Sequence, residues 1–150
     1  MYIKNFFSVA MLFLFLPAIA QFEPGALAQS NEADFITGKY ELPNGLWVKI
    51  YRHGNTYKGK IISVQHYIEG ETLDVKNPSR HLRNRPLVGL EIISGLTFHP
   101  DNGQWIKGEM YAPEKGMTVN LRIEKAGETE LVAVGSKLLF NKTLRWERLP

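Results

Sequence analysis

The chain of 150 residues contains no cysteine. Disulfide bonds, thiol nucleophiles and cysteine-ligated metal sites are therefore excluded. A small domain without disulfides must draw its stability from a packed core or from the closure of a sheet.

A large excess of charge of one sign is also lacking. The chain carries 18 Lys and Arg side chains against 15 Asp and Glu, a net charge of +3. Nucleic-acid-binding proteins concentrate positive charge far more strongly, so this balance argues against that class. Low-complexity tracts, internal repeats and a second long apolar run are absent from the sequence, which favours one globular domain.

The one long apolar run lies at the N-terminus, from residue 6 to residue 16, and follows the positive charge of Lys4. It is shorter than the roughly 20 residues needed to cross a bilayer, which is typical of a signal peptide. Small residues precede a cleavage point after Ala20. We therefore expect residues 1–20 to be a signal peptide, with cleavage after Ala28 as the alternative, and export to the periplasm or the extracellular space.

The remainder shows a series of short strand signals separated by Gly, Pro, Asn and Asp turn signals. We interpret residues 21–35 as a flexible lead-in, with a helical turn that closes one end of a domain spanning residues 36–150. The predicted strands are 36–42, 46–52, 57–67, 87–99, 105–111, 117–124, 129–136 and 143–149, with residues 137–142 as a connection.

About eight short strands without an amphipathic helix indicate an all-β protein, either a small antiparallel meander barrel or a sandwich. We favour the barrel, because successive hairpins need no long crossovers and closure removes exposed strand edges. The interior of an eight-stranded barrel is filled by side chains or holds one small ligand.

The apolar pattern stops between residues 68 and 85, which we interpret as a long excursion with a short strand near residues 73–75. Long loops in compact domains are often functional. The strand that follows, 87–99, is largely apolar on both faces, so one face is expected in the core and the other either covered or lining a cavity.

Arg83 and Arg85 lie in this excursion two positions apart, so their side chains share a face in an extended chain. Two guanidinium groups at a barrel mouth would bind a carboxylate or a phosphate. The alternative is a solvated loop, or one tied down by pairing with Glu91 or Glu109.

Four further residues are candidates for contact with a ligand. Glu91 interrupts an apolar strand, where it would be a ligand contact or a general base if it faces inward, and an ion-paired or outward carboxylate otherwise. Tyr57, Trp105 and Tyr111 are candidates for lining a cavity, with packing in the core as the alternative.

A metal site, a cofactor and a catalytic constellation are not predicted. The histidines 53, 66, 81 and 99 show no ligand spacing, and no serine lies in a G-x-S-x-G turn. We therefore expect a protein that is not an enzyme.

Several motifs are similar, in order and spacing, to those of the bacterial family called domain of unknown function 2147. They are Gly38-Lys39-Tyr40, Val48 to Arg52, Tyr57 to Ile61, Asn77-Pro78, Leu82 to Leu90, Trp105-x-x-Gly108-x-x-Tyr111-x-Pro113-x-x-Gly116 and Trp146-Glu147-Arg148. The chain departs from the family at Tyr40, where Trp is frequent, and at Ala112, where Asp is frequent.

The resemblance implies a small exported protein with a lipocalin-like barrel and names no activity. We expect a non-enzymatic envelope protein that binds a small apolar or amphipathic molecule, which is anionic if the arginine clamp is its contact. The alternative is a protein with a plugged barrel that contacts another envelope component.

Overall fold

The computed structural model describes residue 25 and residues 31–150. The expected signal peptide and its two alternative cleavage points lie outside the described residues, as does most of the expected lead-in. The strands are β1 (Gly38–Glu41), β2 (Trp47–His53), β3 (Thr56–Ser63), β4 (Glu91–His99), β5 (Gln104–Ala112), β6 (Met117–Ala126), β7 (Glu130–Lys137) and β8 (Phe140–Leu149), with one 3₁₀ turn, η1 (Arg80–Leu82).

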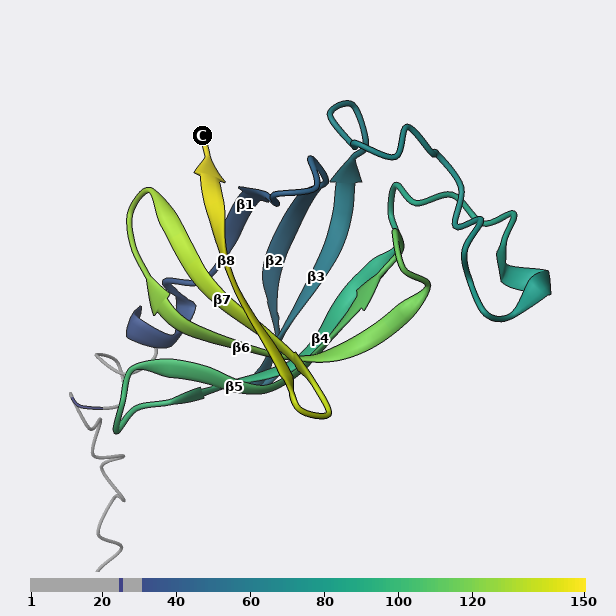
Figure 1. Cartoon of the computed structure of the whole chain (residues 1–150). Helices are drawn as coiled ribbons and strands as arrows, with labels where there is room; N and C mark the ends of the chain where they lie inside the picture. Colours follow the sequence, from purple (N-terminus) through teal and green to yellow (C-terminus); the bar gives the residue numbers. More distant parts are fainter. Residues whose placement is uncertain (1–24, 26–30) are drawn as a thin grey trace, which may run out of the picture.

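The eight strands form a closed antiparallel barrel in sequence order (Figure 1). Each strand pairs with the next, and β8 returns to β1 with Tyr40 opposite Arg148. The predicted all-β barrel of about eight strands is confirmed. Closure pairs the backbone of the first and last strands, which would otherwise be exposed edges.

Period-two alternation places the core inside the barrel. In β6, Leu121 and Ile123 are buried while Asn120 and Arg122 are exposed, as the sequence pattern predicts. Fully buried side chains from the strands and their flanks build this core, including Ile36, Tyr40, Leu46, Val48, Ile61, Leu87, Ile93, Leu96, Ile123, Leu131 and Trp146.

One end of the barrel is covered by a helical turn at residues 31–34, and we call it the closed end. Trp105 Nε1 donates to the carbonyl of Ala33 at 2.9 Å, and the hydroxyl of Tyr57 donates to Asp34 at 2.6 Å. Arg148 donates to the carbonyl of Phe35 at 2.8 Å, so the last strand holds the lead-in in place.

The opposite end carries the turns β1–β2, β5–β6 and β7–β8 and the excursion, which spans residues 64–90; we call it the open end. The excursion lies against two of these turns. A Cβ on Gly45 would fall 1.8 Å from the carbonyl oxygen of His66, and one on Gly116 would fall 2.0 Å from that of Lys76. Glycine is required at both contacts because the two backbones touch.

The prediction of a strand from residue 87 is wrong at its start. Gly89 has a φ of +88° and residues 87–90 form a turn, so β4 begins at Glu91. The expectation that both faces of this strand are covered also fails there, since Leu87 is fully buried whereas Val88 is half exposed. The short strand near residues 73–75 is a single bridge between Leu73 and Pro86.

The prediction of a connection at residues 137–142 is also wrong. Lys137 pairs with Phe140, so β7 and β8 are joined by a two-residue turn at Leu138 and Leu139. The polar residues Asn141 and Lys142 obscured the strand because the apolar alternation of β8 starts only at Leu144.

Candidate functional site

A cavity of about 640 Å³ lies within the barrel on the side of β5, β6, β7 and β8. Its walls are the inward positions of these strands: Met110, Ala112, Met117, Val119, Leu121, Ala133, Gly135, Leu144 and Trp146. Leu121, Ala133 and Trp146 belong to the buried core, which places the deep end of the cavity inside the barrel.

Small side chains explain why this side of the barrel is hollow. Ala112, Ala133 and Gly135 face the cavity, and a Cβ on Gly135 would meet only the Cγ2 atom of Val119, at an ordinary 3.6 Å. The opposite wall carries larger buried residues such as Ile50 and Ile61. The interior is therefore filled on one side and open on the other.

The mouth of the cavity is at the open end, between the β5–β6 and β7–β8 turns. Lys115, Lys137 and Lys142 lie there with one carboxylate, Glu114. Among the described residues, none of the three lysines forms an ion pair. An apolar interior behind a positively charged rim suits a molecule with an apolar body and an anionic head.

The two arginines of the predicted clamp lie in a different place, within a hydrogen-bonded network that we call the Asp74 latch. The side chain of Asp74 is fully buried and pairs with Arg85 at 2.8 Å. It also accepts hydrogen bonds from Tyr111 at 2.7 Å and from Asn77 at 2.8 Å. Arg83 donates to the carbonyl of Asn77 at 2.7 Å.

The latch ties the excursion to β5. Burial, followed by the hydrogen bond and charge of Asp74, raises the pKa of Tyr111 to about 12, so its hydroxyl keeps its proton and donates. Arg85 takes neither of the carboxylate partners considered from sequence, Glu91 and Glu109, because Asp74 occupies its guanidinium group. Ligand binding by Arg83 and Arg85 stays a prediction.

Glu91 lies on the outside of the barrel. Its side chain is 41% exposed and pairs with Lys58 at 3.0 Å, and it accepts a hydrogen bond from Tyr51 at 3.0 Å. Desolvation raises the pKa of Glu91, but the contacts with Lys58 and Tyr51 outweigh it, and the pKa lies below its ordinary value. These contacts match the ion-paired alternative.

The six residues singled out from sequence thus occupy three separate places: the Asp74 latch with Arg83, Arg85 and Tyr111, the closed end with Tyr57 and Trp105, and the outer wall with Glu91. None of the six lines the cavity. Sequence reasoning missed the cavity walls, although the alternation of β6 and the small residues of β7 carry the signal.

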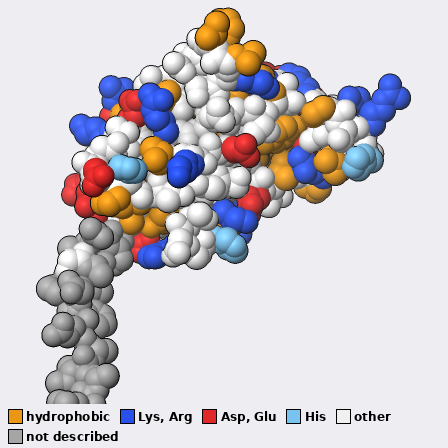
Figure 2. Space-filling model, turned by 90° about the horizontal axis from the view of Figure 1, so that it is seen from below, with side chains coloured by type: hydrophobic (Ala, Val, Ile, Leu, Met, Phe, Trp, Pro, Cys, Tyr) orange, Lys and Arg blue, Asp and Glu red, His pale blue; other side chains and the backbone are white. Residues whose placement is uncertain are grey.

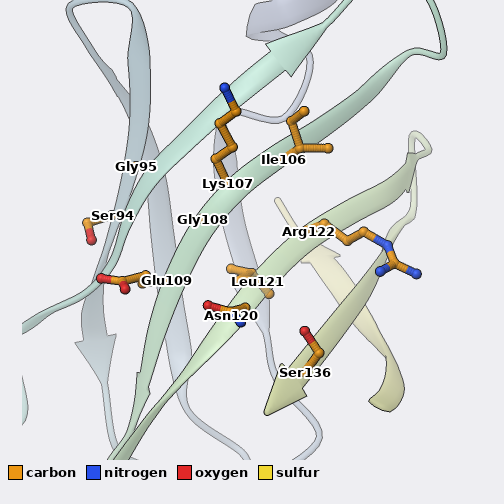
Figure 3. A pocket seen from close by; sticks show the side chains of 10 residues that line it. All are labelled: Ser94, Gly95, Ile106, Lys107, Gly108, Glu109, Asn120, Leu121, Arg122 and Ser136. Atoms are coloured by element: carbon orange, nitrogen blue, oxygen red, sulfur yellow. The ribbon is translucent and has the colours of Figure 1, made fainter. Parts of the chain in front are cut away.

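A second hollow, of about 360 Å³, lies on the outer face of β4 to β7 (Figure 3). Exposed polar side chains surround it, with Ser94 beside Glu109 on neighbouring strands and Arg122 across the hollow. It forms where β5 bulges at Lys107, whose φ is 61°. Its lining mixes polar side chains with Ile106 and Leu121, and it offers far less apolar surface to a ligand than the interior cavity does.

Residue 25 and residues 31–150 include no group of three or more His, Asp or Glu side chains that could hold a metal ion. Within the same residues, no helix has the length and apolar character needed to cross a bilayer.

A closed eight-stranded meander barrel with an apolar interior cavity is the architecture of lipocalin-like proteins. Residues 38–148 match the family described as "Uncharacterized protein conserved in bacteria (DUF2147)", and the chain belongs to this family.

The fold is also found in a solved structure. A Helicobacter pylori protein, HP1028, described as a member of the lipocalin family, superposes with a TM-score of 0.67 and 23% identity. The match covers 77% of this chain and 83% of that one, and at this identity it shows the fold alone. No curated protein matches the chain.

Proposed function

We propose that this protein is a non-enzymatic carrier that binds one small amphipathic molecule in the cavity of its barrel. The apolar body of the ligand lies against β5 to β8, and its anionic head lies near the lysines of the mouth. The protein acts as an exported protein of the cell envelope, as its N-terminal apolar run predicts.

The cavity is the observation that supports this function. Its volume of about 640 Å³ is within the roughly 300–1,000 Å³ of small-molecule sites. A plugged barrel would have large side chains at the positions of Ala112, Ala133 and Gly135, and these residues leave the space open instead. The alternative of a plugged interaction barrel is therefore the weaker candidate.

Filling the cavity is expected to abolish most of the binding. In Gly135→Phe, the new side chain enters the cavity from a backbone that tolerates it, because Gly135 has no positive φ and its Cβ would make only an ordinary contact with Val119, at 3.6 Å. The ring displaces the equivalent of about three methylene groups of ligand at ~0.8 kcal/mol each, so the affinity falls about 50-fold.

The measurement is a titration with the fluorescent amphiphile anilinonaphthalene sulfonate, followed by its displacement with palmitate. Thr118→Phe is the matched control, because Thr118 is exposed on the outer face of the same wall and receives the same side chain. Equal affinities for wild type and Gly135→Phe, or the lack of saturable binding, would contradict the proposal.

A further inference from the structure

The β7–β8 turn is an exposed apolar tip at the mouth of the cavity. Leu138, Leu139 and Phe140 are 92%, 96% and 80% exposed, although folding normally hides such residues. The hairpin projects from the barrel in Figure 1, and Figure 2, a view from below, shows hydrophobic side chains on a projecting part of the surface with Lys or Arg side chains beside them.

Turn chemistry does not explain these residues. A two-residue hairpin turn favours Asn, Asp or Gly, because its backbone enters the left-handed region. Leu138 adopts this conformation, with a φ of 53°, which costs a side chain of its kind free energy. Leu138 therefore neither packs against the rest of the protein nor favours the backbone conformation of the turn. This combination indicates a role in contact with another molecule.

The charges around the tip are positive. Lys137 and Lys142 flank it and Lys115 faces it across the mouth, all three exposed and free of ion pairs among residues 31–150. Lysine side chains extend to place their amines beside anionic headgroups while an apolar tip lies among acyl chains.

The shape favours a lipid surface over a protein partner or a second copy. Three side chains on a narrow projection present less than about 600 Å², whereas a stable dimer buries about 800 Å² on each partner. A bilayer needs no complementary pocket, since it closes around a projecting group.

We infer that the β7–β8 tip docks the protein on a membrane surface that contains anionic lipid. Leu138, Phe140 and Lys142 also line the mouth, so docking turns the opening of the cavity toward the lipid. Membrane attachment of this kind is reversible, because three side chains bury far less apolar surface than a spanning helix.

The test is sedimentation of the processed protein with vesicles of phosphatidylcholine, with and without phosphatidylglycerol. The variant Leu138→Gly/Leu139→Asn/Phe140→Thr keeps the hairpin, because a two-residue turn with a positive φ only at its first central residue favours Gly at that position. We expect its partitioning onto phosphatidylglycerol vesicles to fall at least about 10-fold. Lys137→Gln/Lys142→Gln should lower the partitioning about 10-fold or more, and added salt should weaken wild-type binding.

Ile68→Ser is the matched control, because Ile68 is also apolar and 73% exposed but lies in the excursion, and it should bind vesicles like wild type. Leu139→Trp gives a direct readout: its fluorescence should be quenched by brominated lipid. Unchanged vesicle binding of the triple variant, or no binding by wild type, would overturn the inference.

Two further outcomes distinguish membrane docking from self-association and from ligand uptake. A wild-type dimer in sedimentation velocity that the triple variant abolishes, without vesicle binding, would overturn the inference in favour of self-association. Gly135→Phe should still bind vesicles, since its change lies inside the barrel, so failure of ligand uptake and failure of membrane docking are observed separately.

Discussion

Replacing Asp74 with alanine is expected to destabilise the protein by about 3 kcal/mol. The carboxylate is fully buried and binds Arg85, Tyr111 and Asn77, so its removal leaves a guanidinium, a hydroxyl and an amide without their acceptor. The side chain of Arg85 is 33% exposed. The buried part makes the loss of its carboxylate partner destabilising, whereas the contact of the exposed part with water limits the loss of stability. Chemical denaturation measures the difference.

Loss of the latch should also be visible locally. In Asp74→Ala, hydrogen exchange should accelerate at the backbone amide of residue 74, which donates to the carbonyl of Arg85, more than it accelerates in the strands. Glu109→Ala is the control, because Glu109 is an exposed carboxylate on the same strand as Tyr111. An Asp74→Ala variant within about 0.5 kcal/mol of wild type would show that the network does not hold the excursion.

The second large effect is expected for Gly116→Ala, at about 3–4 kcal/mol. The new Cβ would lie 2.0 Å from the carbonyl oxygen of Lys76, so the excursion must move away from the β5–β6 turn. A positive φ of +60° adds to the cost, because a side chain disfavours that conformation. Thermal unfolding of the two proteins measures the effect.

Gly54→Ala separates the two contributions. Gly54 has nearly the same φ, +62°, but nothing lies within 4 Å of its Cβ position. Gly54→Ala should therefore destabilise the protein only through the strain of a side chain at a positive φ, by about 1 kcal/mol. Equal destabilisation by Gly116→Ala and Gly54→Ala would mean that the backbone at Lys76 moves away at little cost, and that its contact with Gly116 does not fix the excursion.

The sequence predicted the barrel because the information for it is local. Alternation in β6 and turn residues between successive strands mark each hairpin, and hairpins in series close into a barrel. Local signals failed where the structure depends on contacts across the barrel. Residues 87–90 read as a strand because they are apolar, yet the positive φ of Gly89 bends them away from it.

The site was harder to predict for the same reason. A cavity arises where the side chains of one wall are smaller than those of the opposite wall, and no single segment of the sequence shows this difference. Polar residues attract attention in a sequence, but Arg85 finds its partner in Asp74, eleven residues earlier, which no spacing rule indicates. The residues that open the cavity, Ala133 and Gly135, are ordinary in a strand. They indicate a cavity only once it is known that both positions point into the barrel.

The central claim is that the barrel carries a ligand, and native mass spectrometry tests it most directly. The processed protein should be isolated under mild conditions from the cells that make it, and its native mass compared with its denatured mass. We expect an additional, displaceable mass of one small amphipathic molecule per chain, and its absence from Gly135→Phe isolated in the same way. A bare chain from wild type that also takes up no palmitate when it is offered would contradict the claim.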